Sequence, residues 1–184
     1  ETLEKSGSTK PAVPEETTAP AVPTDQENPT DDTNKTIDYN KIFTDSKTGH
    51  WYQFVKTNTT VSVMFIKPSD KTKGTVTIPA KISVDGKYYK VTAIANNACK
   101  GNKKVTKITI GSNVTSIGRN AFYGCKKLKN ITIKTTKLTS KKVGSKAFKG
   151  ISPNAAIKVP KSKLSSYKKI LKAKGVGTKV KVKA

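Results

Sequence analysis

A pattern that recurs about every two dozen residues constrains the fold more than any other feature of the sequence. It occurs in three segments: NACKGNKKVTKITI (97–110), NAFYGCKKLKNITI (120–133) and KAFKGISPNAAIKV (146–159). Their aligned alanines, Ala98, Ala121 and Ala147, are 23 and then 26 residues apart. A unit of this length cannot close a core of its own, so successive units have to stack on one another.

The apolar positions within one unit indicate how each turn of the stack is built. Ile131 and Ile133 alternate inward on a short strand, while Ala121 and Phe122 fill the opposite wall. Gly124 allows a tight turn because glycine tolerates positive φ. The predicted core is therefore made of Ala98, Cys99, Val105, Ile108, Ile110, Ile117, Ala121, Phe122, Cys125, Leu128, Ile131, Ile133, Ala147, Phe148, Ile157 and Val159.

Shorter signals surround the repeats. VTAI (91–94) and VTSI (114–117) predict a second extended stretch in each turn. HWYQFV and TVSVMFI, separated by KTNTT, predict a β-hairpin at residues 39–75, with Val61, Val63 and Phe65 on one face. Asp85-Gly86 predicts a two-residue type I′ turn in a hairpin that projects from the first unit.

The C-terminal segment has the pattern of a helix followed by a strand. After Pro160, Ser162 is placed to cap a helix that Gly175 ends. One face of this helix carries Leu164, Tyr167 and Leu171. In the sequence TKVKVKA, Val180 and Val182 then alternate with lysines, which discourage edge-to-edge aggregation.

Three stretches together resemble the BspA-type (treponemal, type 5) leucine-rich-repeat proteins of anaerobic and gut bacteria. They are VTSIGRNAFYGCKKLKNITI, YYKVTAIANNACKGNKKVTKITIGSNV and AAIKVPKSKLSSYKKILKAKG, and the similarity extends over about residues 41–184. The resemblance implies a secreted or surface-anchored bacterial protein, and some members of this family are implicated in adhesion to host proteins or other bacteria. Cys99 departs from the pattern because it stands where the repeat has Phe, and Asn102 and Ile151 depart because they stand where Cys125 does.

The predicted fold is a β-rich leucine-rich-repeat solenoid with a minor α component. We expect a right-handed superhelix of about three coils with a β-hairpin N-terminal cap and a helix–strand C-terminal cap. We expect residues 1–38 to be a disordered acidic stalk rich in Pro and Thr, and residues 39–184 to form the repeat domain. Within the domain, residues 39–75 are the N-terminal cap, 76–159 the repeats and 160–184 the C-terminal cap. We expect a monomer.

Composition argues against catalysis. The domain has one histidine, His50, and three acids, of which Asp45 is the nearest to it in sequence, with no nucleophile motif. Cys99 and Cys125 lack metal-ligand spacing, so we expect no metal site and no cofactor. They could form one disulfide in a secreted protein, but the repeat alignment favours two buried thiols.

Charge suggests one class of partner. Residues 1–38 carry a net charge of −6, and the remainder carries +30. Such a domain attracts anionic cell-wall polymers, acidic glycans and other polyanions. Arg119 is its one arginine, and few aromatic residues are left for base stacking, so sequence-specific nucleic-acid binding is not expected. The lysines could instead only solvate the surface. The opposite charges also suggest that the acidic stalk folds back on the basic domain.

The outward positions of the repeat strands suggest a second kind of site. Solenoids commonly bind protein or glycan ligands on such extended faces. A threonine ladder is also an ordinary way to fill exposed strand positions. The candidate ligand-binding residues, including those that flank the ladder, are Thr77, Lys107, Thr109, Asn130, Thr132, Lys134 and Lys158.

Overall fold

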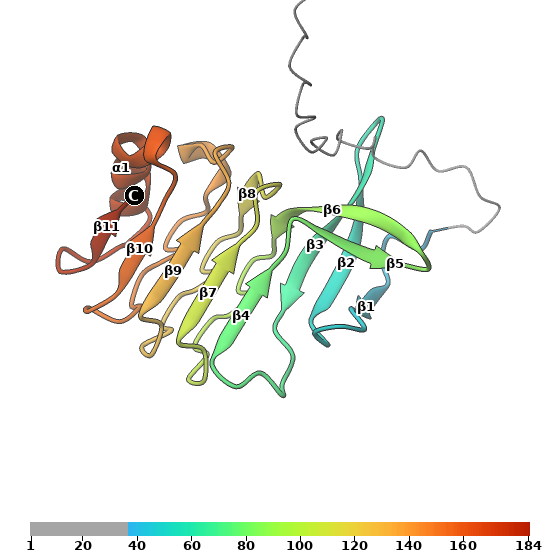
Figure 1. Cartoon of the computed structure of the whole chain (residues 1–184), viewed down its shortest axis with the longest axis horizontal. Coiled ribbons are helices and arrows are strands. Elements are labelled where there is room, and N and C mark those ends of the chain that lie inside the picture. Colours follow the sequence, from blue (N-terminus) through green and yellow to red (C-terminus); the bar gives the residue numbers. More distant parts are fainter. Residues whose placement is uncertain (1–36) are drawn as a thin grey trace, which may run out of the picture.

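The repeats form a stack of parallel strands. The structure, a computed structural model, describes residues 37–184, so the predicted stalk lies outside the described residues except for its last two. Figure 1 shows the strands of this stack side by side. The sheet has the order β11-β10-β9-β7-β4. Its strands are β4 (Thr75–Ile78), β7 (Lys107–Ile110), β9 (Asn130–Ile133), β10 (Ala156–Lys158) and β11 (Lys181–Lys183).

Register within this sheet places equivalent residues of successive units next to one another. Ile108 pairs with Ile131, and Ile131 pairs with Ile157. Val76 and Val182 continue this row at its two ends. Because side chains alternate along a strand, the row turns one continuous apolar face toward the interior and leaves the alternate positions on the outside.

The opposite walls of the stack are joined by backbone pairing as well. Strand β6 (Lys87–Ile94) pairs in parallel with β8 (Ser116–Ile117), which confirms the second extended stretch. In the remaining wall, the backbone N–H of Cys99 donates to the carbonyl of Ala121 at 2.7 Å, and that of Phe122 donates to Ala147 at 2.8 Å. Successive units are therefore hydrogen-bonded to each other on every side.

Residues with positive φ also recur at equivalent positions. Asn97, Asn120 and Lys146 have φ of 59°, 55° and 56°, and glycines with positive φ follow each of them. The side-chain amide of Asn120 lies 3.4 Å from the side-chain oxygen of Asn97. Asn is among the residues that adopt this conformation most readily, whereas Lys146 bears its steric cost.

The strands before the first repeat are joined mainly by antiparallel pairing. Strands β2 (Trp51–Lys56) and β3 (Val61–Lys67) form the predicted hairpin, and β3 pairs in parallel with β6. A further strand, β1 (Ile42–Thr44), pairs with β2. Strand β5 (Lys81–Val84) forms a hairpin with β6. Its turn has φ of 50° at Asp85 and 79° at Gly86, which confirms the positive φ at both positions that a type I′ turn requires.

The C-terminal helix α1 (Leu164–Ala173) packs Tyr167 and Leu171 into the core. The prediction that Ser162 caps it is wrong. A 3₁₀ turn, η2 (Lys161–Lys163), comes first, so Ser162 lies inside that turn and Lys163 is the N-cap residue, with no side-chain hydrogen bond. A second 3₁₀ turn, η1, spans Ser140–Lys142. Gly175, with φ of 99°, follows the end of the helix as predicted.

A single hydrophobic cluster runs from the N-terminal strands to the helix. It contains every residue of the predicted core, including Phe122 at 0% exposure and Ile131 at 2%. The Tyr167 hydroxyl donates to the Thr135 carbonyl at 3.0 Å and accepts from the Leu138 N–H at 3.1 Å, which attaches α1 to the preceding unit. None of the helices between residues 37 and 184 has the length and apolar character of a membrane span.

Candidate ligand-binding face

The outer face of the parallel sheet brings most of the candidate residues into two rows. Thr77 pairs with Thr109, Thr109 with Thr132, and Thr132 with Lys158. Lys107 pairs with Asn130 in the second row. Thr109 and Thr132 are half-buried between their neighbours, whereas the other members are exposed. We call this surface, made of the outward residues of β4, β7, β9, β10 and β11, the sheet face.

The sheet face extends further than the candidate residues. Lys181 and Lys183 continue the rows on β11, and Thr75 begins one of them on β4. The pairing of β11 with β10 could not be read from the C-terminal sequence, which predicts a strand without naming its neighbour. Lys134 is exposed and lies one residue past the end of β9, where its backbone N–H donates to the carbonyl of Ile110.

This surface suits an extended ligand. Neighbouring strands are about 4.8 Å apart, so the row from Thr77 to Lys158 presents hydroxyl and ammonium groups at that spacing. The second row is interrupted at Ala156, which pairs with Asn130 and Lys181. The hydroxyls of Thr77, Thr109 and Thr132 can donate and accept, and the lysines at the C-terminal end can only donate. The face can therefore hydrogen-bond a polar ligand, and its charge is concentrated toward β11.

A hollow of about 270 Å³ adjoins the sheet face at β4. Thr75 and Thr77 line one side of it, and residues from the N-terminal turns, including Thr48, His50 and Ser69, line the other. No sequence signal marked this hollow, because it forms between segments that are far apart along the chain.

The repeat itself can be assigned to a family. Residues 92–173 match the family described as the BspA type leucine-rich repeat region, in six copies. This part of the chain is a BspA-type leucine-rich repeat. The sheet face and the stacked units described above are thus formed largely by the BspA-type region, and β4 and β11 extend it on either side.

Solved structures of bacterial leucine-rich proteins are similar to the chain. One is a leucine-rich cell surface protein from Faecalibacterium prausnitzii, with 24% identity, a TM-score of 0.45 and coverage of 66% of this chain and 37% of that one. Another is a leucine-rich repeat protein from Bacteroides capillosus, with 17% identity, a TM-score of 0.48 and coverage of 73% and 94%. A third, from Bacteroides ovatus, has 24% identity, a TM-score of 0.41 and coverage of 71% and 38%. The chain therefore spans little more than a third of two of these proteins. No curated protein matches it.

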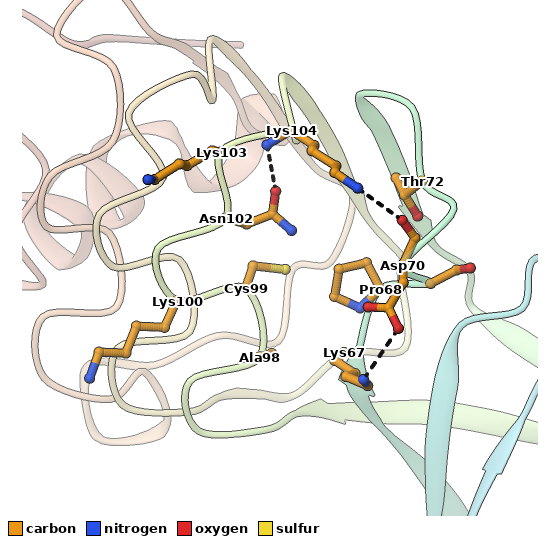
Figure 2. Close-up of a pocket in the computed structure, with 11 residues that line it drawn as sticks. Lys67, Pro68, Asp70, Thr72, Ala98, Cys99, Lys100, Asn102, Lys103 and Lys104 are labelled. Carbon is orange, nitrogen blue, oxygen red and sulfur yellow. Dashed lines mark hydrogen bonds and ion pairs between the residues drawn. The ribbon is translucent and has the colours of Figure 1, made fainter.

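Both cysteines of the BspA-type region are free and buried. Cys99 lines a hollow of about 300 Å³ between the first unit and the loop after β3 (Figure 2). In this loop the Lys67 ammonium lies 3.8 Å from the Asp70 carboxylate, and the Lys104 ammonium donates to the Asp70 backbone carbonyl. The thiol of Cys125 donates to the Cys99 carbonyl at 2.8 Å. Burial raises the pKa of Cys125 to about 11, and the pKa of Cys99 is also raised, chiefly by burial.

These thiols should be unreactive in the folded protein. At pH 8 the Cys125 thiol is therefore almost entirely protonated, and only the thiolate is a good nucleophile. We expect a colorimetric disulfide reagent to label neither cysteine in native buffer and both in denaturant. Rapid labelling of one thiol per native chain would contradict this prediction.

His50 and Asp45 are built into the fold. His50 is 5% exposed, and its Nδ1 accepts a hydrogen bond from the Ser69 backbone N–H at 3.2 Å. Asp45 accepts from the hydroxyl and the backbone N–H of Thr48. Both side chains are thus occupied in fixing turns. Among residues 37–184, no group of three or more His, Cys, Asp or Glu side chains is placed to hold a metal ion.

Burial lowers the pKa of His50, and the nearby Asp45 carboxylate opposes this only in part. The unfolded chain therefore binds a proton more readily, so the free energy of unfolding should fall as the pH decreases below about 6.5. Protonation also removes the acceptor that Ser69 uses. Urea midpoints between pH 7.5 and 5 test this, with His50→Gln as the comparison. An equal decline in the variant would show that other groups cause the effect.

Proposed function

We propose that the domain is a binding module of a secreted or surface-attached bacterial protein, and that its sheet face recognises a protein or glycan ligand. The module is a short right-handed solenoid of about three coils with a β cap at one end and a helix–strand cap at the other. The proposal rests on the register that aligns Thr77, Thr109, Thr132 and Lys158 across four strands.

Other observations support the same proposal. Residues 92–173 match a leucine-rich repeat region, and one of the similar structures is described as a leucine-rich cell surface protein. Repeat units leave their outward strand positions free to vary, since only the inward positions are needed for stacking. The polar character of those outward positions fits a hydrated ligand such as a glycan or a polar protein surface.

A second candidate function is attachment to an anionic cell-wall polymer. It is favoured by the excess of basic residues in residues 39–184, where 33 basic side chains face three acidic ones. The exposed pairs Lys103–Lys104 and Lys126–Lys127 lie off the sheet face, at equivalent positions of adjacent units. In this case the binding energy would come from counterion release and would not depend on the sheet face in particular.

One experiment separates the two functions. Binding of the full chain to a glycan array, to host matrix proteins and to teichoic acid is measured at low and at physiological salt. Lys107→Glu/Lys158→Glu changes the sheet face, and Lys126→Glu/Lys127→Glu makes the same change in charge elsewhere on the surface. If the sheet face is the site, only the first variant loses affinity, by about tenfold or more for lost charge-assisted contacts.

The neutral variant Thr109→Ala/Thr132→Ala should weaken such a ligand without changing the charge. Equal losses in both lysine variants, together with a steep decrease in affinity as salt rises, would favour the polymer over a ligand of the sheet face. A ligand that is bound equally well by all three variants would contradict both proposals.

A further inference from the structure

A hollow of about 700 Å³ opens at the N-terminal end of the fold, away from the sheet face. Its lining residues belong to β1, β2, the projecting β5–β6 hairpin and the segment just before β1, and Figure 1 shows these strands at the same end of the fold. Its apolar lining consists of Phe43, Phe54, Tyr89, Ile37 and Val84. We call it the aromatic groove. The stacking of the repeats does not require it, because the groove is formed by the antiparallel strands that precede the first repeat and by the inserted hairpin.

Three aromatic rings from three different strands form the groove. The ring of Phe54 lies 4.8 Å from that of Phe43 and 5.0 Å from that of Tyr89, centroid to centroid. Phe43 and Phe54 are only half-buried, so the fold leaves part of their surface uncovered. The rim is polar and includes Lys41 and Asp38. Thr44, Asp85 and Lys87 are further polar lining residues, so the hollow suits a ligand with an apolar body and polar flanks.

Residues 1–36, which lie outside the described residues, join the described part of the chain at this groove. Ile37, the first described residue, lines the groove, so residues 1–36 are covalently attached at the groove. Their sequence contains the tetrapeptide Pro-Ala-Val-Pro twice, at 11–14 and at 20–23. In the polyproline II conformation, with three residues per turn, the two prolines of such a motif lie on one side. This is the pattern that aromatic-lined grooves bind in other proline-rich peptides.

We propose that a Pro-Ala-Val-Pro motif of the protein's own N-terminal segment binds in the aromatic groove. The thirteen residues 24–36 separate the second motif from Ile37, and they can span up to about 45 Å when extended, which is enough to turn back. Because the motif is tethered, its effective concentration at the groove is on the order of millimolar, so weak stacking contacts suffice.

Charge favours the same occupant. The segment 1–38 carries −6 and the domain +30, so the two attract each other before any specific contact forms. Attraction alone would place the segment anywhere on the lysine-rich surface. The groove differs from that surface in its aromatic lining, and the motif differs from the rest of the segment in its prolines and valine. Binding of the motif in the groove can therefore be tested separately from general charge attraction.

The test uses the full chain with a spin label on Thr18→Cys, which lies between the two motifs. The two native cysteines are buried, and the labelled parent chain without this substitution measures any background. Relaxation enhancement is recorded at the amides of Phe54 and Tyr89, at low ionic strength and in about 1 M salt, where charges are screened beyond about 3 Å. We expect loss of peak intensity at both residues in both conditions.

Two variants make the result specific without altering the folded domain. Changing Pro11, Pro14, Pro20 and Pro23 to Ala keeps the charge and should abolish the intensity loss at the groove. Pro29→Ala, outside both motifs, should preserve it. Intensity loss that survives the four substitutions, or that disappears in high salt, would overturn the proposal.

A mixture of labelled chain and isotope-enriched unlabelled chain completes the test. Intensity loss in the unlabelled chain would mean that the motif binds the groove of a second copy, which also overturns the intramolecular assignment.

Discussion

Phe122→Ala is expected to lower the free energy of unfolding by about 3–5 kcal/mol. The side chain is fully buried, and its ring lies 5.2 Å from that of Phe148 in the next unit. The backbone around it is hydrogen-bonded to that unit at Phe122 and Gly124 and to the preceding unit at Ala121, so the surrounding wall cannot collapse into the vacated space. A cavity should therefore remain, and its cost adds to the lost burial of the ring.

Urea denaturation followed by circular dichroism measures the effect. Lys126→Ala, an exposed change four residues away, should alter the stability by no more than about 0.5 kcal/mol. Phe148→Ala should be measured both alone and together with Phe122→Ala. The double variant should lose less stability than the sum of the two single losses, because the two rings contact each other. A loss below 1 kcal/mol for Phe122→Ala, with an unchanged dependence on urea, would contradict the buried stack.

The second large effect is expected at a glycine where two units touch. A Cβ at Gly118 would lie 2.4 Å from the backbone nitrogen of Asn96 and 2.5 Å from the carbonyl carbon of Ala95. The N–H of Gly118 also donates to the carbonyl of Ile94 at 2.8 Å. Gly118→Ala must therefore push the two backbones apart, and overpacking of this kind costs about 1–3 kcal/mol or more.

Two comparisons establish the cause. Gly144 repeats the contact one unit later, where a Cβ would lie 2.3 Å from the nitrogen of Arg119, so Gly144→Ala should behave alike. Gly177 has no atom within 4 Å of the added Cβ and does not have positive φ, so Gly177→Ala should leave the stability unchanged or raise it slightly. Similar melting temperatures for the variants at Gly118 and Gly177 would show that the units are not in close contact.

The sequence predicts the repetitive parts of this fold well for a physical reason. A residue such as Ile131 recurs in kind at Ile108 and Ile157, so each position is supported by copies of itself and the inward strands follow from the period. The Asp85-Gly86 turn could be predicted for a different reason, because its two residues are of types that tolerate positive φ. The family resemblance, and with it the leucine-rich-repeat fold, also came from these copies.

Parts without a repeated signal were harder to predict. Strand β1 has three residues, too few for an alternating pattern, and it exists because β2 offers an edge. Ser162 had the residue type of a helix cap, but the chain turns one residue after Pro160 and the helix begins later. Ile37 was expected in the stalk, and it packs against the core.

The candidate site shows the same division. The threonine rows follow from the period, so Thr77, Thr109 and Thr132 could be named from the sequence. The hollow beside β4 and the aromatic groove could not, because each forms where segments distant along the chain meet. Lys181 and Lys183 joined the sheet face only through the pairing of β11 with β10.

The identical register of β7 and β9 makes the length of the molecule adjustable. Residues 107–110 pair one to one with residues 130–133. Among the described residues, each strand of this sheet pairs only with the strands of the adjacent units. Duplicating one unit of 23 residues should therefore insert cleanly and lengthen the body by about 4.8 Å. The length of the solenoid, and the number of ligand groups that its sheet face can contact, could then be changed by duplicating existing units.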